Sequence, residues 1–489
     1  MTARIYPTIA AAVNAASRTA VAPLGWDPVN HLLSRFSFGP TASSRAFVAR
    51  RGPDAWYDLM VGRARRYPAY SAHGGIAKVG PLLSLSPYET RQWLKANNRE
   101  YGWDAMDQLG MVTLGLQAFS PSQLFEVLVD FFSNHLNVPN HNGDMWVTRH
   151  CYDRDVIRRH AVGSFTNMLL ASARHPAMLT YLNLAQSTKA AVNENFGREL
   201  LELHTVGLRY SESDVKNAAR LLTGNTMTGT FTYVYDSTIH ATGRVQVLGF
   251  THTNTSAAGG QKAGEDLLRY LASHPYTAQN LARKLCVRFV SDAPSTDLVN
   301  AVAKAYLDGR TQILPMVSTI LRSAEFWQSR GKKVRRPLEN LHATIRIAGV
   351  GVSSWKDALG TMNWLSTDVG QRPLDWPAPN GYPDVAGAWR SPGTLLTVWE
   401  QHLGLVGGWW GGFRKPDIES MYTGATTSGQ AIAMLTQRLT GTTWKQEHLD
   451  ALQAFLAEPA TTLVTKSNLR WNAYPLAAII LDGPHHALR

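Results

Sequence analysis

The stretch "SPSQLFEVLVDFFSNHLNVPN" (residues 120–140) decides the fold class, because it carries the pattern that the rest of the chain repeats. Its apolar residues recur every three or four positions, which is typical of an α-helix that packs into a core. Ser120 and Pro121 are expected to start this helix, and Pro139 is expected to stop it from continuing. The polar pair Asn134–His135 at its end is expected either to cap the helix or to line a cavity.

Helical patterns with clear start and stop signals continue on both sides of this stretch. In "WDPVNHLLSRFSFGPT" (26–41), Asp27 is the expected N-cap, Pro28 takes the first helical position, and Gly39–Pro40 ends the helix. In "SESDVKNAARLLTGN" (211–225), Ser213 is the expected cap and Gly224 the stop. Further helices are expected in 152–187, broken at Gly163 and at His175–Pro176, and in 277–291, 295–309 and 313–327.

Two segments depart from the helical pattern. Residues 224–253 are rich in Thr, Val, Tyr and Phe with glycine punctuation, which predicts a small β-hairpin insert at about 225–253. Residues 366–394 carry five prolines and little periodicity, and "PLDWPAPNGYPD" (373–384) is expected to fold back as an ordered loop over the helical body.

The expected fold is therefore mainly α, a compact multi-helix body with that hairpin insert and an irregular C-terminal segment rich in Pro, Gly and Trp. A tail or short helix is expected over 1–25, followed by a single domain over 26–489. Within that domain we expect a helical core over 26–350 and an irregular to helical part over 351–489.

The composition indicates a folded protein that favours anionic partners. With 44% hydrophobic residues in 489, the chain is too apolar to be mostly disordered, and its net charge of +12 attracts polyanions. A surplus that serves only solubility is the alternative. Nucleic acid is not favoured, because the strongest basic cluster, "RGKKVRRP" (330–337), is short. The chain contains two cysteines, Cys151 and Cys286, and each is expected to be a small buried apolar residue.

The sequence leaves the cellular location open. No apolar run reaches the roughly eighteen residues that a membrane-spanning helix needs. The first residues lack the basic start, apolar centre and cleavage pattern of a signal peptide. The location is therefore expected to be either cytoplasmic or exported together with a partner.

The densest group of reactive side chains lies in "NENFGRELLELHTVG" (193–207). On a regular helix, Asn195, Glu199 and Glu202 share one face with Arg198 at its edge, and Gly207 is a suitable stop. A solvated helix face would look similar. However, two glutamates one turn apart repel each other, and an exposed face more often pairs Glu with Lys.

This group suits either of two kinds of chemistry. Paired carboxylates beside Asn and Arg can carry out acid–base catalysis, with His135 as a further candidate. A divalent or transition metal could instead be held by Glu199, Glu202 and histidines; His135, His160 and His204 are the candidates. The spacing matches neither His-Glu-x-x-His nor Glu-x-x-His. No P-loop, Rossmann fingerprint or Gly-x-Ser-x-Gly elbow is present.

Several long segments together resemble the bacterial domain of unknown function (DUF) 1800 family. The resemblance extends over nearly the whole chain, and its most distinctive part is 193–207 followed by 211–224. The other segments are "HLLSRFSFGPT" (31–41), "FFSNHLNVP" (131–139), 155–187, "KLCVRF" (284–289), "RRPLEN" (335–340) and "PNGYPDVAGAW" (379–389).

The resemblance implies a shared signature rather than a known activity. Glu194, Asn195, Arg198, Glu199, Glu202 and His204 belong to that signature, which raises the expectation that this helix is functional. Members often occur beside a second family, domain of unknown function 1501, whose proteins carry export signals and resemble sulfatases and phosphatases. The resemblance thus implies an envelope or extracellular role and a partner of that type.

Three functions remain as hypotheses. The first is a hydrolase or lyase on an anionic glycan-like polymer, with Glu199 as acid or base and Glu202, Asn195 and Arg198 orienting or tuning it. Fifteen tryptophans suit sugar stacking. The second is a metal-dependent oxidoreductase with carboxylate and histidine ligands. The third is a non-catalytic assembly or export partner of a secreted sulfatase- or phosphatase-like protein.

Overall fold

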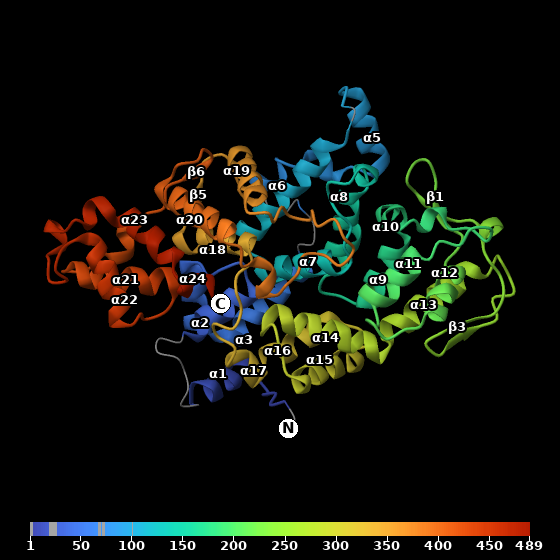
Figure 1. Cartoon of the computed structure of the whole chain (residues 1–489), viewed down its shortest axis with the longest axis horizontal. Helices are drawn as coiled ribbons and strands as arrows, with labels where there is room; N and C mark the ends of the chain where they lie inside the picture. Colours follow the sequence, from blue (N-terminus) through green and yellow to red (C-terminus); the bar gives the residue numbers. More distant parts are fainter. Residues whose placement is uncertain (1–2, 19–26, 67–69, 71–73, 100) are drawn as a thin grey trace.

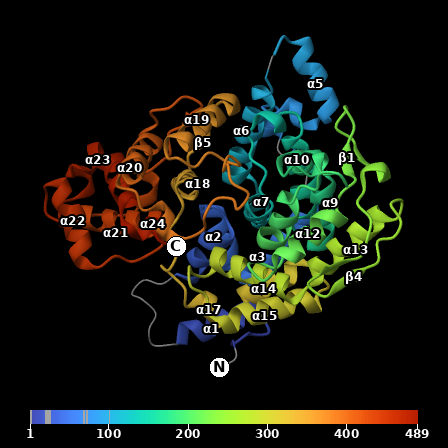
Figure 2. The ribbon, with the colours of Figure 1, turned by 45° about the vertical axis from the view of Figure 1, so that its right-hand side comes forward.

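The computed structural model describes residues 3–18, 27–66, 70, 74–99 and 101–489. The chain is mainly helical, as predicted, and its few short strands form antiparallel pairs at the periphery (Figure 1). Figure 2, turned from that view, shows helices α21–α23 at one end of the molecule and the hairpins at the other. Among the described residues, none of the helices is long and apolar enough to span a membrane.

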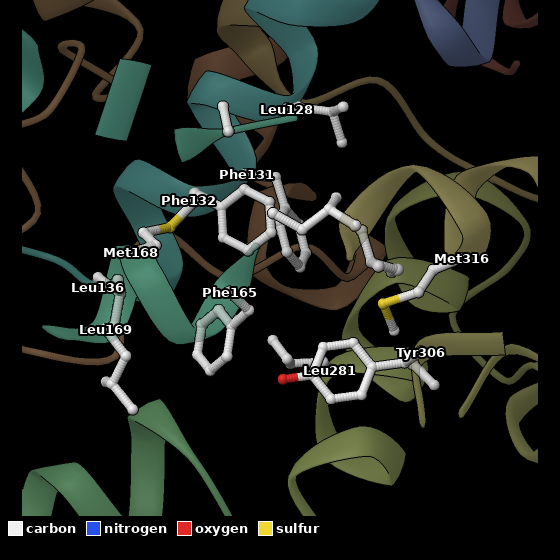
Figure 3. Packing of buried hydrophobic residues seen from close by; sticks show 14 of the residues in the cluster. Leu128, Phe131, Phe132, Leu136, Phe165, Met168, Leu169, Leu281, Tyr306 and Met316 are labelled. Carbon is white, nitrogen blue, oxygen red and sulfur yellow. The ribbon is translucent and has the colours of Figure 1, made fainter. Parts of the chain in front are cut away.

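Helix α7, Gln123–His135, lies at the centre of the molecule (Figure 1). It begins at Gln123, slightly later than predicted, because Ser120 instead ends the preceding helix, its backbone N–H bonding to Leu116. The Gln123 side chain donates to the Ser120 carbonyl at 2.8 Å and so stabilises the turn between the two helices. Most of α7 is buried, and Figure 3 shows Phe131, Phe132 and Leu136 packed against side chains of other helices.

Two hydrophobic clusters form the interior. The first surrounds α7 and includes residues from Ile9 to Trp327, without the segment around 70–118. Its helices are α1 (Ile9–Arg18), α2 (Pro28–Phe36), α3 (Ala42–Arg66, bent at Gly52), α8 (Arg149–Tyr152), α9 (Phe165–Arg174), α10 (Pro176–Tyr181), α11 (Asn195–Glu199), α12 (Glu212–Leu221), α13 (Gly260–Ser273), α14 (Pro275–Phe289), α15 (Thr296–Asp308), α16 (Ile313–Leu321) and α17 (Ala324–Trp327), with π-helical turns η4 (Asp153–Arg158) and η6 (Leu200–His204).

The second cluster joins residues 70–118 to the C-terminal part of the chain. Helix α6 of the first half packs on α19 and α18 of the second, so the two parts of the sequence share one core. Its helices are α4 (Gly74–Ala77), α6 (Trp103–Phe119), α18 (Pro337–Ala348), α19 (Trp355–Asp368), α20 (Pro392–Gly407), α21 (Ser428–Thr440), α22 (Gln446–Leu456) and α23 (Leu469–Asp482). Two further helices of this part of the molecule, α5 (Pro87–Ala96) and α24 (Pro484–Ala487), contribute no residue to the cluster.

The β-rich insert consists of two short hairpins. Strand β1 (Asn225–Met227) pairs with β2 (Tyr233–Tyr235), and β3 (Val245–Val247) pairs with β4 (Phe250–His252). Buried His240 lies between the hairpins, where its ring bonds the Thr223 carbonyl at 2.8 Å and Asn254 Oδ1 at 2.9 Å. A third small pair, β5 (Gly351–Val352) with β6 (Phe413–Arg414), lies in the C-terminal part.

The ends of two predicted segments differ in detail. Ser211 caps α12 in place of the predicted Ser213, because Ser211 and Asp214 form a reciprocal capping box. The N-terminal segment contains helix α1, whose first backbone N–H groups are accepted by Asp54 at 2.9 and 2.8 Å. The part of that predicted segment over 19–25 lies outside the described residues.

Candidate functional site

The signature segment is not one regular helix. It begins as α11 and continues from Leu200 to His204 as the π-helical turn η6. The Thr205 hydroxyl donates to the Leu200 carbonyl at 2.6 Å, and Gly207 takes φ +74° to turn the chain away. Single π-helical turns inside helices are frequent at functional sites. His204, which α-helical spacing places on a different face from Glu202, is buried in the core.

Three consecutive carbonyl groups at the end of this turn each accept a hydrogen bond from another helix. Lys284 Nζ donates to Leu203 at 3.1 Å, and Asn280 Nδ2 donates to Thr205 at 2.7 Å. His135 Nε2 contacts the His204 carbonyl at 3.1 Å. The carbonyls at a helix end have no partner within the helix. Helices α7 and α14 therefore hold the end of the signature helix in place.

His135 has a positioning role in this arrangement. Because its Nε2 faces a carbonyl, Nε2 carries the proton, and Nδ1 accepts from Lys284 Nζ at 3.1 Å. Burial, with the charge of Lys284, holds the pKa of His135 well below its ordinary value, so the ring is neutral. Both ring nitrogens are thus engaged, and neither is free for a metal or a substrate.

The predicted metal ligands do not gather around one point. Within the described part of the chain, no group of three or more His, Cys, Asp or Glu side chains is arranged to hold a metal ion. His204 is buried with Nε2 unbonded, and burial lowers its pKa to about 3. His160 lies beyond η4, where burial and Arg159 lower its pKa. The set of His135, His160, Glu199, Glu202 and His204 is therefore spread over separate environments.

Glu199 is partly buried beside Glu202. Burial and the charge of Glu202 both raise the pKa of Glu199, whereas Arg198 opposes this shift. The carboxylate also acts on Tyr181, whose pKa rises to about 12, mainly through burial. The Tyr181 hydroxyl donates to the Pro377 carbonyl at 2.8 Å, so the loop predicted over 373–384 lies close to this carboxylate.

Glu202 lines a surface cleft of about 610 Å³ between the signature helix, α14 and α15. Its carboxylate accepts a hydrogen bond from the Tyr210 hydroxyl, and it is the one carboxylate among the described lining residues. Arg209 and Arg283 supply positive charge, and Arg209 stacks on the Tyr276 ring at 4.6 Å. The remaining polar lining consists of side-chain amides and one hydroxyl: Gln279, Asn280, Asn300 and Thr296.

Arg198 and Asn195 do not reach this cleft. Arg198 forms a two-pronged ion pair with Glu212 at 2.7 Å for both contacts, and it lies 3.5 Å from Glu194. The hydrogen bonds that Arg198 donates to Glu212 are the main cause that raises the pKa of Arg198. The Asn195 backbone N–H donates to Asn193 Oδ1 at 2.9 Å. Neither residue lines the cleft, but Tyr210 connects Arg198 to Glu202, because the Tyr210 side chain interacts with both.

The comparison with protein families agrees with this signature. The profile of the family described as "Protein of unknown function (DUF1800)" matches residues 31–488, nearly the whole chain. The chain belongs to the DUF1800 family. No curated protein and no solved structure matches it.

The segments that resemble the DUF1800 family meet in one buried charge network. Arg288 of "KLCVRF" and Arg336 of "RRPLEN" both pair with Glu339, the latter at 3.1 Å. Arg336 also pairs with Asp130 of α7 at 2.6 Å, and Arg288 lies 3.7 Å from Asp384 of "PNGYPD". The surrounding cations, Arg288 first, hold the pKa of Glu339 well below its ordinary value despite its burial. These family segments therefore share a structural role as partners in one buried charge network.

The loop 373–384 is ordered on the helical body, which confirms the prediction. Asn137 donates to the carbonyls of Trp376 at 2.8 Å and Ala378 at 2.7 Å. The Tyr382 backbone N–H donates to Asn134 Oδ1 at 2.9 Å. Gly381 has φ +68° and approaches the Asn134 backbone so closely that a Cβ atom would lie 2.3 Å from its carbonyl oxygen. Asn134 therefore holds the loop against α7 through its contacts with Gly381 and Tyr382.

Sequence reasoning found Glu202 but missed the residues around it. Tyr210, Arg209 and Arg283 carry no motif that connects them to Glu202. Only the spacing of Asn280, Lys284 and Arg288, at i, i+4 and i+8 in the apolar pattern of 277–291, gave a signal. A row of polar side chains on a helix that must be buried predicts that each of them has a partner inside the protein. Asn280 and Lys284 donate to carbonyl groups at the end of the signature helix, and Arg288 pairs with Glu339.

Proposed function

We propose that this chain is a hydrolase or lyase that acts on an anionic glycan-like polymer bound in the Glu202 cleft. The observation that carries the proposal is the charge of the cleft: one carboxylate stands among two arginines and several amides. Arginine recognises carboxylate and sulfate groups, and amides bond to hydroxyl groups. Arg209 and Arg283 would repel a cationic substrate and would bind an anionic polymer more strongly than a neutral one.

In this proposal Glu202 is the acid–base group, rather than Glu199. Glu202 reaches the cleft, whereas Glu199 lies one turn earlier and acts through its charge. The Tyr210 hydroxyl donates a hydrogen bond to the Glu202 carboxylate and so holds that side chain in the cleft. A carboxyl group held within reach of a bound sugar can transfer a proton to or from it.

The two reaction types use the same residues differently. In hydrolysis, Glu202 would protonate the leaving glycosidic oxygen or activate a water molecule. In elimination, it would remove the proton beside a uronate carboxylate while Arg209 or Arg283 stabilises the negative charge that develops. The bond from the next carbon to the glycosidic oxygen then breaks, a C=C bond forms, and the leaving oxygen takes a proton from water. The rigid support of η6 by Lys284 and His135 favours either step, since it fixes the Glu202 backbone before the substrate binds.

The proposal can be tested on three purified polymers: a polyuronate, a sulfated glycan and a neutral glucan. New reducing ends indicate cleavage, and ultraviolet absorption by a new C=C bond identifies elimination. We expect cleavage of an anionic polymer, and a KM about tenfold higher for Arg283→Gln, because one charged hydrogen bond is lost. Arg50→Gln, an exposed arginine of α3 outside the cleft, is the control. Cleavage of the neutral glucan alone would contradict the proposal.

The non-catalytic partner role stays a second candidate, because α20 exposes apolar side chains. Leu396 is 62% exposed and Leu395 and Trp399 lie beside it. Exposed apolar patches of this kind mark protein–protein contacts. If a partner of the DUF 1501 type binds here, it should co-purify with the wild-type chain and not with Leu396→Glu. Equal co-purification with both would exclude α20 as the contact surface, and absence of the partner from both preparations would remove this candidate.

A further inference from the structure

A second cavity, of about 590 Å³, lies between the N-terminal and C-terminal parts of the chain. Helices α2 and α3 form one side, and α21, α22 and α24 form the other. It shares no lining residue with the Glu202 cleft. A ligand in this cavity would therefore contact helices from both ends of the chain and be separate from the proposed catalytic cleft.

The lining of this cavity is strongly basic. Five of its lining side chains are cations: Arg45, Arg330, Arg335, Lys445 and Arg489. Its described lining contains no Asp or Glu. Carboxylates behind the wall compensate in part. Glu339 lies 3.0 Å from Arg489, Glu447 lies 3.6 Å from Lys445, and Asp27 acts on Arg45 and Arg330 from the start of α2.

Unbonded polar atoms gather around the same space. Arg45 donates once, to the Arg438 carbonyl at 2.6 Å, and its Nε and Nη2 have no partner among the described residues. Nδ1 of His448, His485 and His486 is likewise without one. His486 lines the cavity and is 1% exposed, so solvent does not replace the missing partner of its Nδ1. Buried polar groups normally find a partner, and orphans in a native structure call for a ligand, ion or water.

The cations of this wall also repel one another. Burial and then Arg489 lower the pKa of Arg335 to about 9. Burial, His448 and Arg330 lower the pKa of His485. A bound anion would relieve this repulsion, as an anion stabilises the charged form of every basic group near it.

The apolar part of the wall indicates the rest of the ligand. Ile347, Leu439 and Leu488 line it together with two prolines, and Trp444 stacks on His485 at 4.3 Å. An isolated inorganic ion would leave this apolar surface unused. Sites for small organic ligands combine such walls with a few polar groups.

We propose that this cavity binds a small phosphate or sulfate ester, with the oxyanion between Arg45, Lys445 and the histidines, and with its organic part against Leu439 and Ile347. Arginine and imidazolium groups suit tetrahedral oxyanions of either element. The ligand would tie α2 and α3 to α21 and α22, so binding should also raise the melting temperature.

Isothermal titration with phenyl phosphate, phenyl sulfate, adenosine monophosphate and inorganic phosphate tests this proposal. We expect at least one ester to bind more tightly than inorganic phosphate. Comparison of phenyl phosphate with phenyl sulfate shows which kind of ester the cavity prefers. Arg45→Gln and Lys445→Gln should each weaken binding about tenfold, since each removes a charged hydrogen bond. Lys304→Gln, which removes an exposed positive charge on α15, should bind normally.

Thermal melts of the free variants check that they fold. Lys445 is 67% exposed, so Lys445→Gln is expected to melt like the wild type and gives a test that is free of folding defects. Absence of binding by all three esters would overturn the proposal, as would binding that Lys445→Gln leaves unchanged. Neither result bears on the Glu202 cleft, and failure of polymer cleavage leaves this cavity unaffected.

Discussion

Among the individual residues, Glu202 and Glu199 have different roles in the proposed chemistry: Glu202 transfers the proton, and Glu199 acts through its charge. The sequence places both on one face, but the structure puts only Glu202 in the cleft and leaves Glu199 partly buried behind it. In the proposed mechanism, Glu199 therefore acts only through its charge. The Arg198 side chain, expected beside them, is bound to Glu212 at the rim instead.

Replacing Glu199 tests this division. Its folded-state pKa is raised, so the folded protein holds the proton more tightly than the unfolded chain, and the carboxylate costs stability as pH rises above about 4.5. Glu199→Gln removes that cost. At pH 7 we expect the free energy of unfolding to stay equal or rise, by no more than about 1 kcal/mol. Any gain should vanish below pH 4. Urea melts at both pH values measure it, and a clear loss at pH 7 would show that Glu199 has a stabilising partner.

Among the helices, the π-helical turn η6 depends on residues that are distant in the sequence. Periodicity predicted a helix in 193–207, and the structure has α11 and η6 over 195–204, which end three residues before the expected stop at Gly207. The wide turn was not predictable, because its carbonyls bond to Lys284, His135 and Asn280, which belong to other helices. Likewise, one β-rich segment was evident in 224–253, but its division into two hairpins follows from the position of His240.

The buried amine that supports η6 gives a pH-dependent prediction. Burial lowers the pKa of Lys284 from 10.5 to about 8. Between these two pH values, the unfolded chain therefore binds more protons than the folded protein does. The contribution of Lys284 to the free energy of unfolding should therefore rise with pH across this range, by at most about 3 kcal/mol. Lys284→Met should lack this rise. In urea melts at pH 7.5 and 10.5, the free energy of unfolding of the wild type should increase relative to that of the variant as the pH rises. A difference between the two proteins that stays constant with pH would contradict the assignment.

The loop 373–384 supplies a steric test with a matched control. Gly381→Ala would force a Cβ atom to 2.3 Å from the Asn134 carbonyl oxygen, at φ +68°. We expect a loss of about 2 kcal/mol or more, together with faster proteolysis of the loop. Gly387→Ala is the control, since nothing lies within 4 Å of its Cβ position. Equal stability of the two variants would contradict the close packing of the loop.

For the whole molecule, the buried network around Glu339 explains why distant family segments occur together. Composition and periodicity predicted a mainly helical body, and the fold confirms that. They did not predict which polar residues would be internal, because Arg288, Arg336 and Asp384 become neighbours only after folding. Arg35 extends the network, donating to the carbonyls of Phe289 and Ser329. The DUF1800 segments thus define the core as well as the cleft.

Removal of the central acid should weaken the entire fold. Glu339→Gln would leave Arg288, Arg336 and Arg489 with too little negative charge in a buried environment, which costs roughly 3–5 kcal/mol. The folded-state pKa of Glu339 is depressed, so its contribution is present above about pH 4.5 and is lost as pH falls through the folded value. The wild type should approach the variant in acid. Glu447→Gln, an exposed carboxylate, is the control, and equal melting of the two variants at pH 7 would contradict the assignment.

The most direct test of the proposed function is the turnover of an anionic polymer by Glu202→Gln. The side chain keeps its shape, and its partner Tyr210 can still form a hydrogen bond, so folding and substrate binding should remain. Loss of a proton-transferring group lowers kcat by roughly 10²–10⁴. We predict a fall of that size in kcat, with KM and melting temperature close to the wild type. A variant that cleaves the polymer at the wild-type rate would contradict the account.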